Sequence, residues 1–535
     1  MTRRQLLRLA SAAGIATAWG STGGVPAAFA AAAAPRPVRG GTLQVALAAD
    51  PAGLNPWRNV SIISIMPVAP CYNGIVTTDT TTWKNVVGDL AESWSVSPDG
   101  KTYTFTMRRG NIRWHDGQPL TIDDIVYSLQ TMGKPVPGTD NTMIETMQNV
   151  ASADALSAST FRIVLKQPDA DFLTELTEEY AMILPKHILQ TGADLNTTVV
   201  GTGPYKLQEY RPGAYIDIVR NPDYGVHPGL PYFDGIRFTI VPDRATRLAA
   251  VATERVDTLG RSGPEWLTGQ EVAQIQSQNH DAKKWPVPSL LGYHIMMNSK
   301  KPPFNDVRVR KAAFLAPDRQ LAVKVIAKGD GMLPGFFPPG WGISAADLAQ
   351  LPGYRQSKDQ DLADAKALLK AAGYANGLPF TILTRVQSST LEGAQFAAQQ
   401  LSAVGFQPTI KPVDDAQFWD TGAKGDHQAM VFTPGTSFPI NDFGRVITAN
   451  GRLNFTGQDA DPVTRDLWTK QEAELSADKR KDYLRQIEQH WFTELYGTAP
   501  MVWVVPYFVS SPRVQNFPQA GDRWGLSWDA SWLTK

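Results

Sequence analysis

Cysteine is almost absent from this chain, whose 535 residues contain a single one, Cys71. One thiol cannot form a disulfide within the chain, so the stability of the fold must come from packing. We expect Cys71 to be a small buried side chain and not a reactive thiol. Histidine is also scarce, with seven scattered residues and no H-x-x-x-H pair, which argues against a structural metal site. The sequence therefore predicts no cofactor and no metal.

The chain also lacks an excess of charge of either sign, because 51 Lys and Arg balance 51 Asp and Glu. Residues 1–30 hold three arginines and no acid, so the remainder has 48 basic and 51 acidic residues. This slightly acidic remainder lacks the basic footprint of a nucleic-acid binder and the polybasic segment of a membrane anchor. No apolar run reaches the ~20 residues that a membrane-spanning helix needs.

The start of the chain has the pattern of an export signal. The stretch "TRRQLLRLASAAGIATAWGSTGGVPAAFAAAAAP" combines two adjacent arginines, a weakly apolar middle and small residues before an A-x-A-like site near Ala30. The twin arginine resembles a Tat signal, with an ordinary Sec peptide as the alternative. We predict a Tat-type signal peptide over residues 1–30 and a leader over 31–39. No cysteine lies near its end, so we expect a protein that is free in the periplasm and not a lipoprotein.

The rest of the chain alternates between strand and helix patterns. A hydrophobic fraction of 43% is ample for packed cores, and the length suggests roughly three structural units. In "KTYTFTMRRG", Tyr103, Phe105 and Met107 alternate with threonines, which is typical of a strand with one buried face. The preceding Asp99-Gly100 predicts a tight turn and a hairpin with "AESWSVS".

Helix signals follow, and they indicate a mixed α/β fold. Thr121 is placed to cap a helix that has Asp123 and Asp124 in its first turn. Farther along, "FTILTR" and "PTIKPV" flank a helical segment, and this order predicts two parallel strands joined by a right-handed crossover. The pattern indicates two α/β lobes and a more antiparallel insert.

Motifs for catalysis are missing. There is no G-x-S-x-G elbow and no dinucleotide fingerprint, and "GTGPY" lacks the Gly-Lys pair and the helix of a phosphate loop. The acid pairs Glu178–Glu179 and Asp414–Asp415 have the setting of solvated helix or loop edges. The sequence therefore offers no constellation that requires an enzyme.

Tryptophan is abundant, with 15 residues. Indole rings fill cores and also bind sugars and apolar ligand groups. We expect most of them to be structural, Trp94 and Trp114 among them. Trp57, Trp341 and Trp419 are candidates for facing a ligand.

A series of phrases in a fixed order resembles the family 5 extracellular solute-binding proteins, the dipeptide- and oligopeptide-binding receptors of ABC importers. Each phrase is weak alone, but together they cover nearly the whole chain after the signal. They are "GGTLQVALAADPAGLNPW", "DLAESWSVSPDGKTYTFTMRRGNIRWHDGQPLTIDDIVYSL", "GTGPYKLQEYRPG", "RNPDY", "PYFDGIRFTIVPD", "KKPPFNDVRVRKAAFLAPDR" and "AKALLKAAGY".

The resemblance implies an α/β, periplasmic binding protein-like fold of class II, in which two α/β lobes are joined by a hinge and lobe I carries an extra α+β insert domain. The two crossing segments should lie near 290–298 and 499–508. The implied boundaries are lobe I at 40–80, 199–292 and 505–535, the insert domain at 81–198, and lobe II at 297–503.

The resemblance also implies positions that contact a ligand. In peptide-binding members a cleft aspartate holds the peptide's α-ammonium, and Ser437 stands at that place here. A buried ammonium without a counter-charge is costly, so a peptide with a free amino group is disfavoured unless Asp442 replaces that carboxylate. Arg385 stands where some dipeptide binders pair an arginine with a carboxylate; a surface role is the alternative. The predicted substrate-binding set is Val60, Ser61, Ile62, Arg261, Ser262, Arg385, Trp419, Thr433, Pro434, Gly435 and Ser437.

The function that follows from the resemblance is that of a periplasmic substrate-binding protein of an ABC transporter. It would bind a small polar solute in a cleft between the lobes and deliver it, by hinge closure, to permease subunits with cytoplasmic ATPases. We expect a monomer that is not an enzyme. A short or modified peptide is the first ligand class, with an oligosaccharide, an opine-like anion or a nickel chelate as alternatives. A secreted hydrolase with two facing carboxylates, or a scaffold that uses the same cleft, is a remote alternative.

Overall fold

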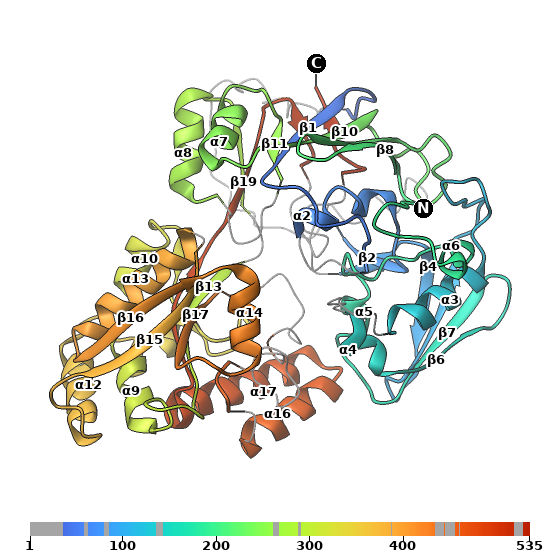
Figure 1. Cartoon of the computed structure of the whole chain (residues 1–535). Helices are drawn as coiled ribbons and strands as arrows, with labels where there is room; N and C mark the ends of the chain where they lie inside the picture. Colours follow the sequence, from blue (N-terminus) through green and yellow to red (C-terminus); the bar gives the residue numbers. More distant parts are fainter. Residues whose placement is uncertain are drawn as a thin grey trace, which may run out of the picture. The chain divides into compact units, whose positions relative to one another are not determined.

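Three sheets organise residues 38–535, which form one unit separate from residues 1–37. The computed structural model places them as Figure 1 shows. The residues that it describes are 36–57, 62–79, 85–134, 143–260, 267–286, 290–386, 388–433, 443, 455–458, 461–517 and 528–534.

The seven-stranded sheet is mixed and has the buried strand β1 at its centre. Residues 43–47 of β1 are almost all buried, and the strand runs parallel to both β10 and β11. A turn at Pro212-Gly213 joins β8 and β9 in antiparallel pairing, with Gly213 at a φ of 74°. In spatial order the strands are β12 (Lys283–Pro286), β19 (Tyr507–Ser510), β11 (Thr258–Leu259), β1 (Thr42–Leu47), β10 (Gly235–Ile240), β9 (Tyr215–Arg220) and β8 (Tyr205–Arg211).

The four-stranded sheet is entirely antiparallel. Tyr103, Phe105 and Met107 on β5 are buried and the threonines between them are half-buried, as the alternation predicts. Thr121 caps α3 (Ile122–Met132) in a reciprocal capping box with Asp124, which confirms the predicted helix start. The strands in order are β4 (Ala91–Val96), β5 (Thr102–Met107), β7 (Thr160–Leu165) and β6 (Val150–Ala155).

The six-stranded sheet combines parallel and antiparallel pairs. The parallel pairing of β15 with β16 across α13 (Ser388–Ser402) is confirmed over the whole length of both strands. The strands in order are β14 (Gly331–Met332), β18 (Thr498–Val504), β13 (Leu291–Met297), β17 (Ala429–Phe432), β15 (Leu378–Arg385) and β16 (Phe406–Val413).

The remaining described elements pack around these sheets. They are α2 (Ile62–Ile65), η1 (Ala69–Cys71), β2 (Val76–Thr78), β3 (Val86–Gly88), α4 (Met143–Gln148), α5 (Phe172–Glu175), α6 (Lys186–Thr191), α7 (Arg244–Ala252), α8 (Gly269–Gln278), α9 (Val307–Leu315), α10 (Arg319–Val325), α11 (Ala345–Leu348), α12 (Asp359–Ala371), α14 (Asp415–Ala423), α16 (Pro462–Ala473), α17 (Ala477–His490), η2 (Trp491–Leu495), β20 (Val514–Gln515) and β21 (Trp532–Leu533).

The chain passes between the seven-stranded and the six-stranded sheet at two places. One connection leads from β12 through residues 287–290 into β13, and the other leads from β18 through Val505 and Pro506 into β19. Two large hydrophobic cores match this arrangement. One contains residues of the seven-stranded and four-stranded sheets, and the other contains residues of the six-stranded sheet.

The structure confirms the predicted burial of Cys71 and contradicts the predicted exposure of Glu179. Cys71 is fully buried, and burial raises the pKa of its thiol far above the ordinary value, as expected for a packing side chain. The prediction that Glu178 and Glu179 lie at a solvated edge is wrong for Glu179, which is 1% exposed. Its segment follows α5 into the core, where the neighbouring Leu176 and Ala181 are buried, and this burial leaves no local sequence signal.

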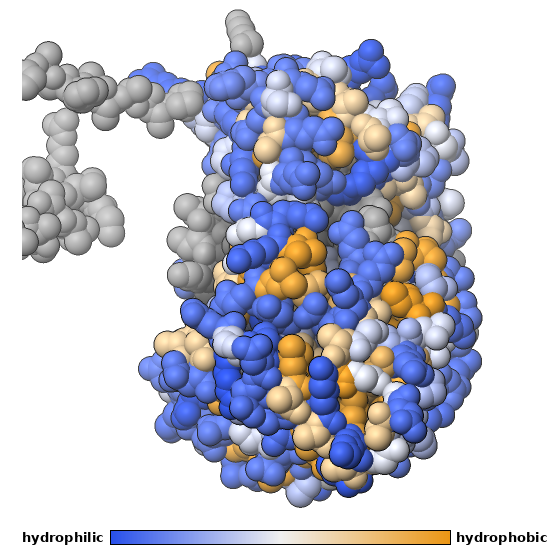
Figure 2. All heavy atoms as spheres, turned by 90° about the vertical axis from the view of Figure 1, so that its left-hand side faces the viewer, coloured by the Kyte–Doolittle hydropathy of each residue, from blue (hydrophilic) through white to orange (hydrophobic). Residues whose placement is uncertain are grey.

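None of the helices in the described parts of the chain is long and apolar enough to cross a membrane. Figure 2 views the face that carries α8, α10 and α12, and this face is mostly hydrophilic with small hydrophobic groups between. Leu321 and Val325 of α10 are among the exposed apolar side chains. Single exposed apolar side chains of this kind are common on protein surfaces.

Candidate ligand-binding site

Arg385 is the last residue of β15 and is only 7% exposed. Its guanidinium Nη2 donates a hydrogen bond of 2.8 Å to the hydroxyl of Thr433, the residue that follows β17. Since β15 and β17 are parallel, their carboxyl ends meet at one edge of the sheet, which brings these two predicted residues together. The carboxyl edge of parallel strands is where open α/β sheets bind ligands.

Aromatic rings hold the Arg385 guanidinium in place. Its central carbon lies 5.2 Å from the ring centroid of Phe418 and 5.7 Å from that of Trp419, both on α14. Asp414 caps this helix by accepting a 2.8 Å hydrogen bond from the backbone of Gln417. A guanidinium that lies over aromatic rings is a favourable partner for a carboxylate.

The turn after β15 is fixed by reciprocal hydrogen bonds. The Thr384 hydroxyl donates to the carbonyl of Thr390 at 3.2 Å, and the Thr390 hydroxyl donates to the carbonyl of Arg385 at 3.1 Å. Both threonines are fully buried. These bonds join the backbone at Arg385 to the first turn of α13.

This edge of the six-stranded sheet is also where the chain departs for the seven-stranded sheet. The last residue of β17, Phe432, pairs with His294, which lies three positions after the start of β13. Leu291 at that start pairs with Val504, the last residue of β18. Both connections to the seven-stranded sheet therefore leave from the edge that carries Arg385 (Figure 1).

The structure does not describe the side chains of the other predicted ligand-contacting residues. Ile62 begins the short helix α2, and nothing is described of its side chain. The rest lie outside the described residues: Val60, Ser61, Arg261, Ser262, Pro434, Gly435 and Ser437, together with the alternative Asp442.

The three candidate tryptophans have different surroundings. Trp57 is 7% exposed and its indole N–H donates to the carbonyl of Met182 at 2.9 Å, so its role is structural. Trp341 lies beneath the Arg480 guanidinium at 5.6 Å. Trp419 alone among them lies beside Arg385. Phe418, which the sequence analysis did not single out, shares that position, and its adjacency to Trp419 in the chain is the signal that was available.

In the described part of the chain, no three side chains of His, Cys, Asp or Glu gather closely enough to hold a metal ion. Arg385 instead provides a fixed positive charge among rings and a hydroxyl. This arrangement can bind an anionic group.

Comparison with known proteins identifies the family and the fold of this chain. The family model described as "Bacterial extracellular solute-binding proteins, family 5 Middle" matches residues 85–449. The glutathione-binding protein GsiB of Salmonella choleraesuis (strain SC-B67) is 31% identical over 377 residues, which is 70% of this chain and 70% of that protein. GsiB of Escherichia coli (strain K12) is 30% identical over 376 residues, with the same 70% shares.

Solved structures share the fold. The periplasmic binding protein DppA from Helicobacter pylori, in complex with peptide STSA, has a TM-score of 0.78 at 22% identity, covering 93% of this chain and 99% of that one. AgaA from A. tumefaciens R10, in complex with agropinic acid, has a TM-score of 0.77 at 23% identity, covering 92% and 99%. These likenesses confirm the periplasmic binding protein-like α/β fold. The chain therefore belongs to the bacterial extracellular solute-binding proteins of family 5, and it is a binding protein and not an enzyme.

Proposed function

We propose that this protein is the periplasmic receptor of an ABC importer and that it binds a small anionic solute between its two α/β lobes. The observation that carries the proposal is Arg385, a buried guanidinium at the carboxyl edge of β15, bonded to Thr433 and backed by Phe418 and Trp419. A carboxylate on the ligand would pair with the guanidinium in a site sheltered from water, where such a pair is strong.

The lobes that we propose follow the boundaries expected from the sequence. Lobe I comprises 40–80, 199–292 and 505–535, lobe II comprises 297–503, and the insert domain comprises 81–198. Most strands of the three sheets fall within these ranges, which supports the division, but β13 (Leu291–Met297) of the six-stranded sheet begins before residue 297 and β18 ends one residue after 503. The hinge would consist of the two connections, and closure would bury the ligand against Arg385.

Two classes of ligand deserve the first tests. The relatives named above bind glutathione, and DppA and AgaA were solved with a peptide and with agropinic acid, respectively. All three are compatible with an arginine that holds a carboxylate. We propose a modified peptide such as glutathione as the first class and an opine as the second.

We also propose that residues 1–30 direct export by the Tat pathway and that the exported protein is a monomer in the periplasm. The two adjacent arginines and the small residues near Ala30 support this route. Replacing both Arg3 and Arg4 by Lys should abolish export through Tat while leaving Sec-dependent proteins unaffected.

Calorimetric titration of the exported protein tests the binding proposal. We expect one molecule of glutathione or of an opine to bind per chain and to be recovered unchanged. The Arg385→Ala variant, checked for an unaltered circular dichroism spectrum, should bind the same ligand more than tenfold more weakly. Preference for an uncharged oligosaccharide, with no effect of Arg385→Ala, would contradict the proposal.

A further inference from the structure

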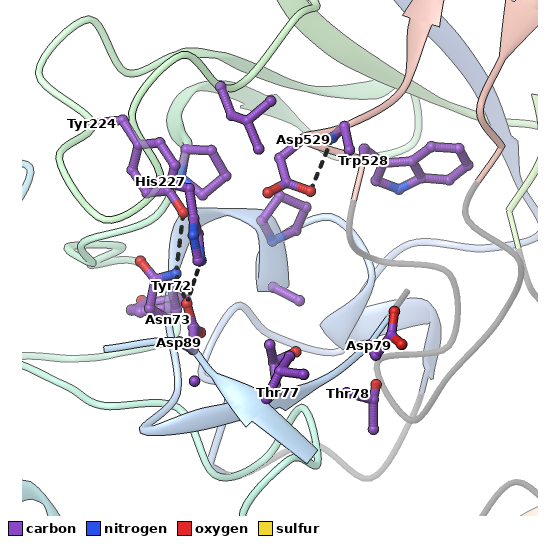
Figure 3. A pocket seen from close by; sticks show the side chains of 17 residues that line it. Tyr72, Asn73, Thr77, Thr78, Asp79, Asp89, Tyr224, His227, Trp528 and Asp529 are labelled. Carbon is purple, nitrogen blue, oxygen red and sulfur yellow. Dashed lines mark hydrogen bonds and ion pairs between the residues drawn. The ribbon is translucent and has the colours of Figure 1, made fainter. Parts of the chain in front are cut away.

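A cavity lies on the side of the seven-stranded sheet and shares no residue with the Arg385 site. Its volume is about 260 Å³, which corresponds to roughly eight or nine water molecules. The walls come from the segment around η1, the strands β2 and β3, the loop after β9 and residues 528–530 near the C-terminus (Figure 3). We call it the Asp529 pocket, after one of the carboxylates that line it.

The acidic side chains that line this pocket outnumber the basic ones. Asp79, Asp89 and Asp529 line it, together with His227, and no lysine or arginine is among the described residues of its walls. Carboxylates gathered in a partly enclosed space repel one another and lose hydration, so the site favours a ligand with positive charge.

Asp89 is a fixed part of the site. It is 2% exposed, and its carboxylate accepts hydrogen bonds from the Asn73 side chain at 2.8 Å and from the Gly74 backbone at 2.9 Å. The ring of His227 lies 3.3 Å from the same carboxylate. These contacts hold both groups in place at one side of the cavity.

Asp529 faces this pair from the other side, as Figure 3 shows. Its carboxylate accepts a 3.0 Å hydrogen bond from the backbone of Ala530. Burial raises the pKa of Asp529, and the nearby charge of Asp89 adds to the effect while that of His227 opposes it. The folded protein therefore holds this carboxylate at a free-energy cost that a bound cation would reduce.

Trp528 provides an independent sign of a ligand. The residue is 3% exposed and lines the cavity, yet its indole Nε1 has no hydrogen-bond partner among the described residues. Figure 3 shows the nitrogen-bearing edge of the ring turned toward the other labelled residues. A buried N–H donor is rarely left unpaired, so an acceptor atom on a bound molecule would satisfy it.

We propose that the Asp529 pocket binds a small organic ammonium ion that also carries a hydrogen-bond acceptor or a second amine. A metal ion is the less suitable cation, because no group of three potential metal ligands occurs among the described residues. An ammonium group donates in several directions and can bridge Asp529 and the Asp89–His227 side, while Thr77 and Thr78 offer hydroxyl groups. The site is independent of the proposed function, because it shares no residue with the anion site at Arg385.

Putrescine and butanediol form a matched pair of probes, since they have the same length and differ in having amines or hydroxyls. We expect putrescine to raise the melting temperature of the exported protein and to bind in calorimetry, and butanediol and acetate to do neither. At about ten times the dissociation constant, the ligand favours the folded state by a factor of roughly eleven. Equal effects of putrescine and butanediol would overturn the proposal, as would a larger effect of Mg²⁺ or Ca²⁺.

Single substitutions test whether putrescine binds in the Asp529 pocket. Asp529→Asn removes the charge at constant volume and should weaken putrescine binding more than tenfold. Trp528→Phe should weaken it severalfold. Asp478→Asn, at a position whose side chain is 97% exposed, is the matched control and should change nothing. Arg385→Ala should weaken binding of the anionic ligand more than tenfold and leave putrescine binding unchanged, which separates this site from the proposed function. Unchanged putrescine binding in Asp529→Asn would overturn the assignment.

Discussion

The Asp171 carboxylate and the Arg480 guanidinium are joined by two hydrogen bonds, of 2.7 and 2.6 Å, although the residues lie 309 positions apart. Asp171 precedes α5 on the side of the four-stranded sheet, and Arg480 belongs to α17 on the side of the six-stranded sheet. Both residues are 6% exposed. The pair is therefore a buried link between the proposed insert domain and the proposed lobe II.

Breaking this link should be costly. In Arg480→Ala the Asp171 carboxylate stays buried without its cation, and such changes destabilise proteins by about 3–5 kcal/mol. Urea unfolding measures the effect. Arg485→Ala is the control on the same helix, because Arg485 is half exposed and pairs with Asp482 one turn away. A loss below 1 kcal/mol in Arg480→Ala would show that the link is not maintained in solution.

Stability should also depend on pH through Glu472, whose carboxyl group interacts electrostatically with both Asp171 and Arg480. Burial raises the pKa of Glu472 to about 7, with the charges of Asp169 and Asp171 adding to it and the Trp468 hydrogen bond opposing it. Because the folded state holds the proton more tightly, this contribution is present below the ordinary pKa near 4.5 and is lost as pH rises toward 7.

Glu472→Gln isolates that contribution. The variant should lose less stability than the wild type between about pH 4.5 and 7, with a difference on the order of 2 kcal/mol. Subtracting the two profiles removes the effect of Glu488, whose pKa burial also raises to about 7. Parallel profiles for both proteins would mean that Glu472 is hydrated in solution.

Substitutions at Arg385 should distinguish charge from geometry. Arg385→Lys keeps the positive charge but loses the planar fork and the stacking on Phe418 and Trp419, so we expect partial retention of affinity for an anionic ligand. Thr433→Val removes the hydroxyl that accepts from Arg385 and should weaken binding about fivefold, which is about 1 kcal/mol. Calorimetry measures both. Full affinity in Arg385→Lys would show that the fork makes no contact with the ligand.

Ser437→Asp tests the specificity expected from the sequence. The position lies outside the described residues, and the prediction depends on the resemblance to peptide binders, which have a carboxylate there. Affinity for dipeptides with a free amino group should rise, and affinity for their N-acetylated forms should not. No gain would mean that residue 437 is not at the ammonium position.

Sequence reasoning worked where the signal is local. The alternation at Tyr103, Phe105 and Met107, the cap at Thr121 and the parallel strands that end at Arg385 depend on neighbours within a few residues or on one crossover. The relationships it missed join distant parts of the chain. The residues that neighbour Asp171 in the sequence give no indication that its side chain pairs with Arg480.

The Asp529 pocket could not be predicted from the sequence either. Asp89, His227 and Asp529 come from three separate segments, and their proximity depends on how the C-terminal residues return to the start of the fold. The burial of Glu179 was missed for the same reason, since a pair of adjacent acids looks alike at a surface and beneath a neighbouring segment.

Small-angle X-ray scattering of the exported protein, with and without the anionic ligand identified by calorimetry, tests the receptor account most directly. We predict a smaller radius of gyration when the ligand is added, with no such change in Arg385→Ala at the same concentration. A scattering profile that is identical with and without a tightly bound ligand would contradict closure of two lobes around Arg385.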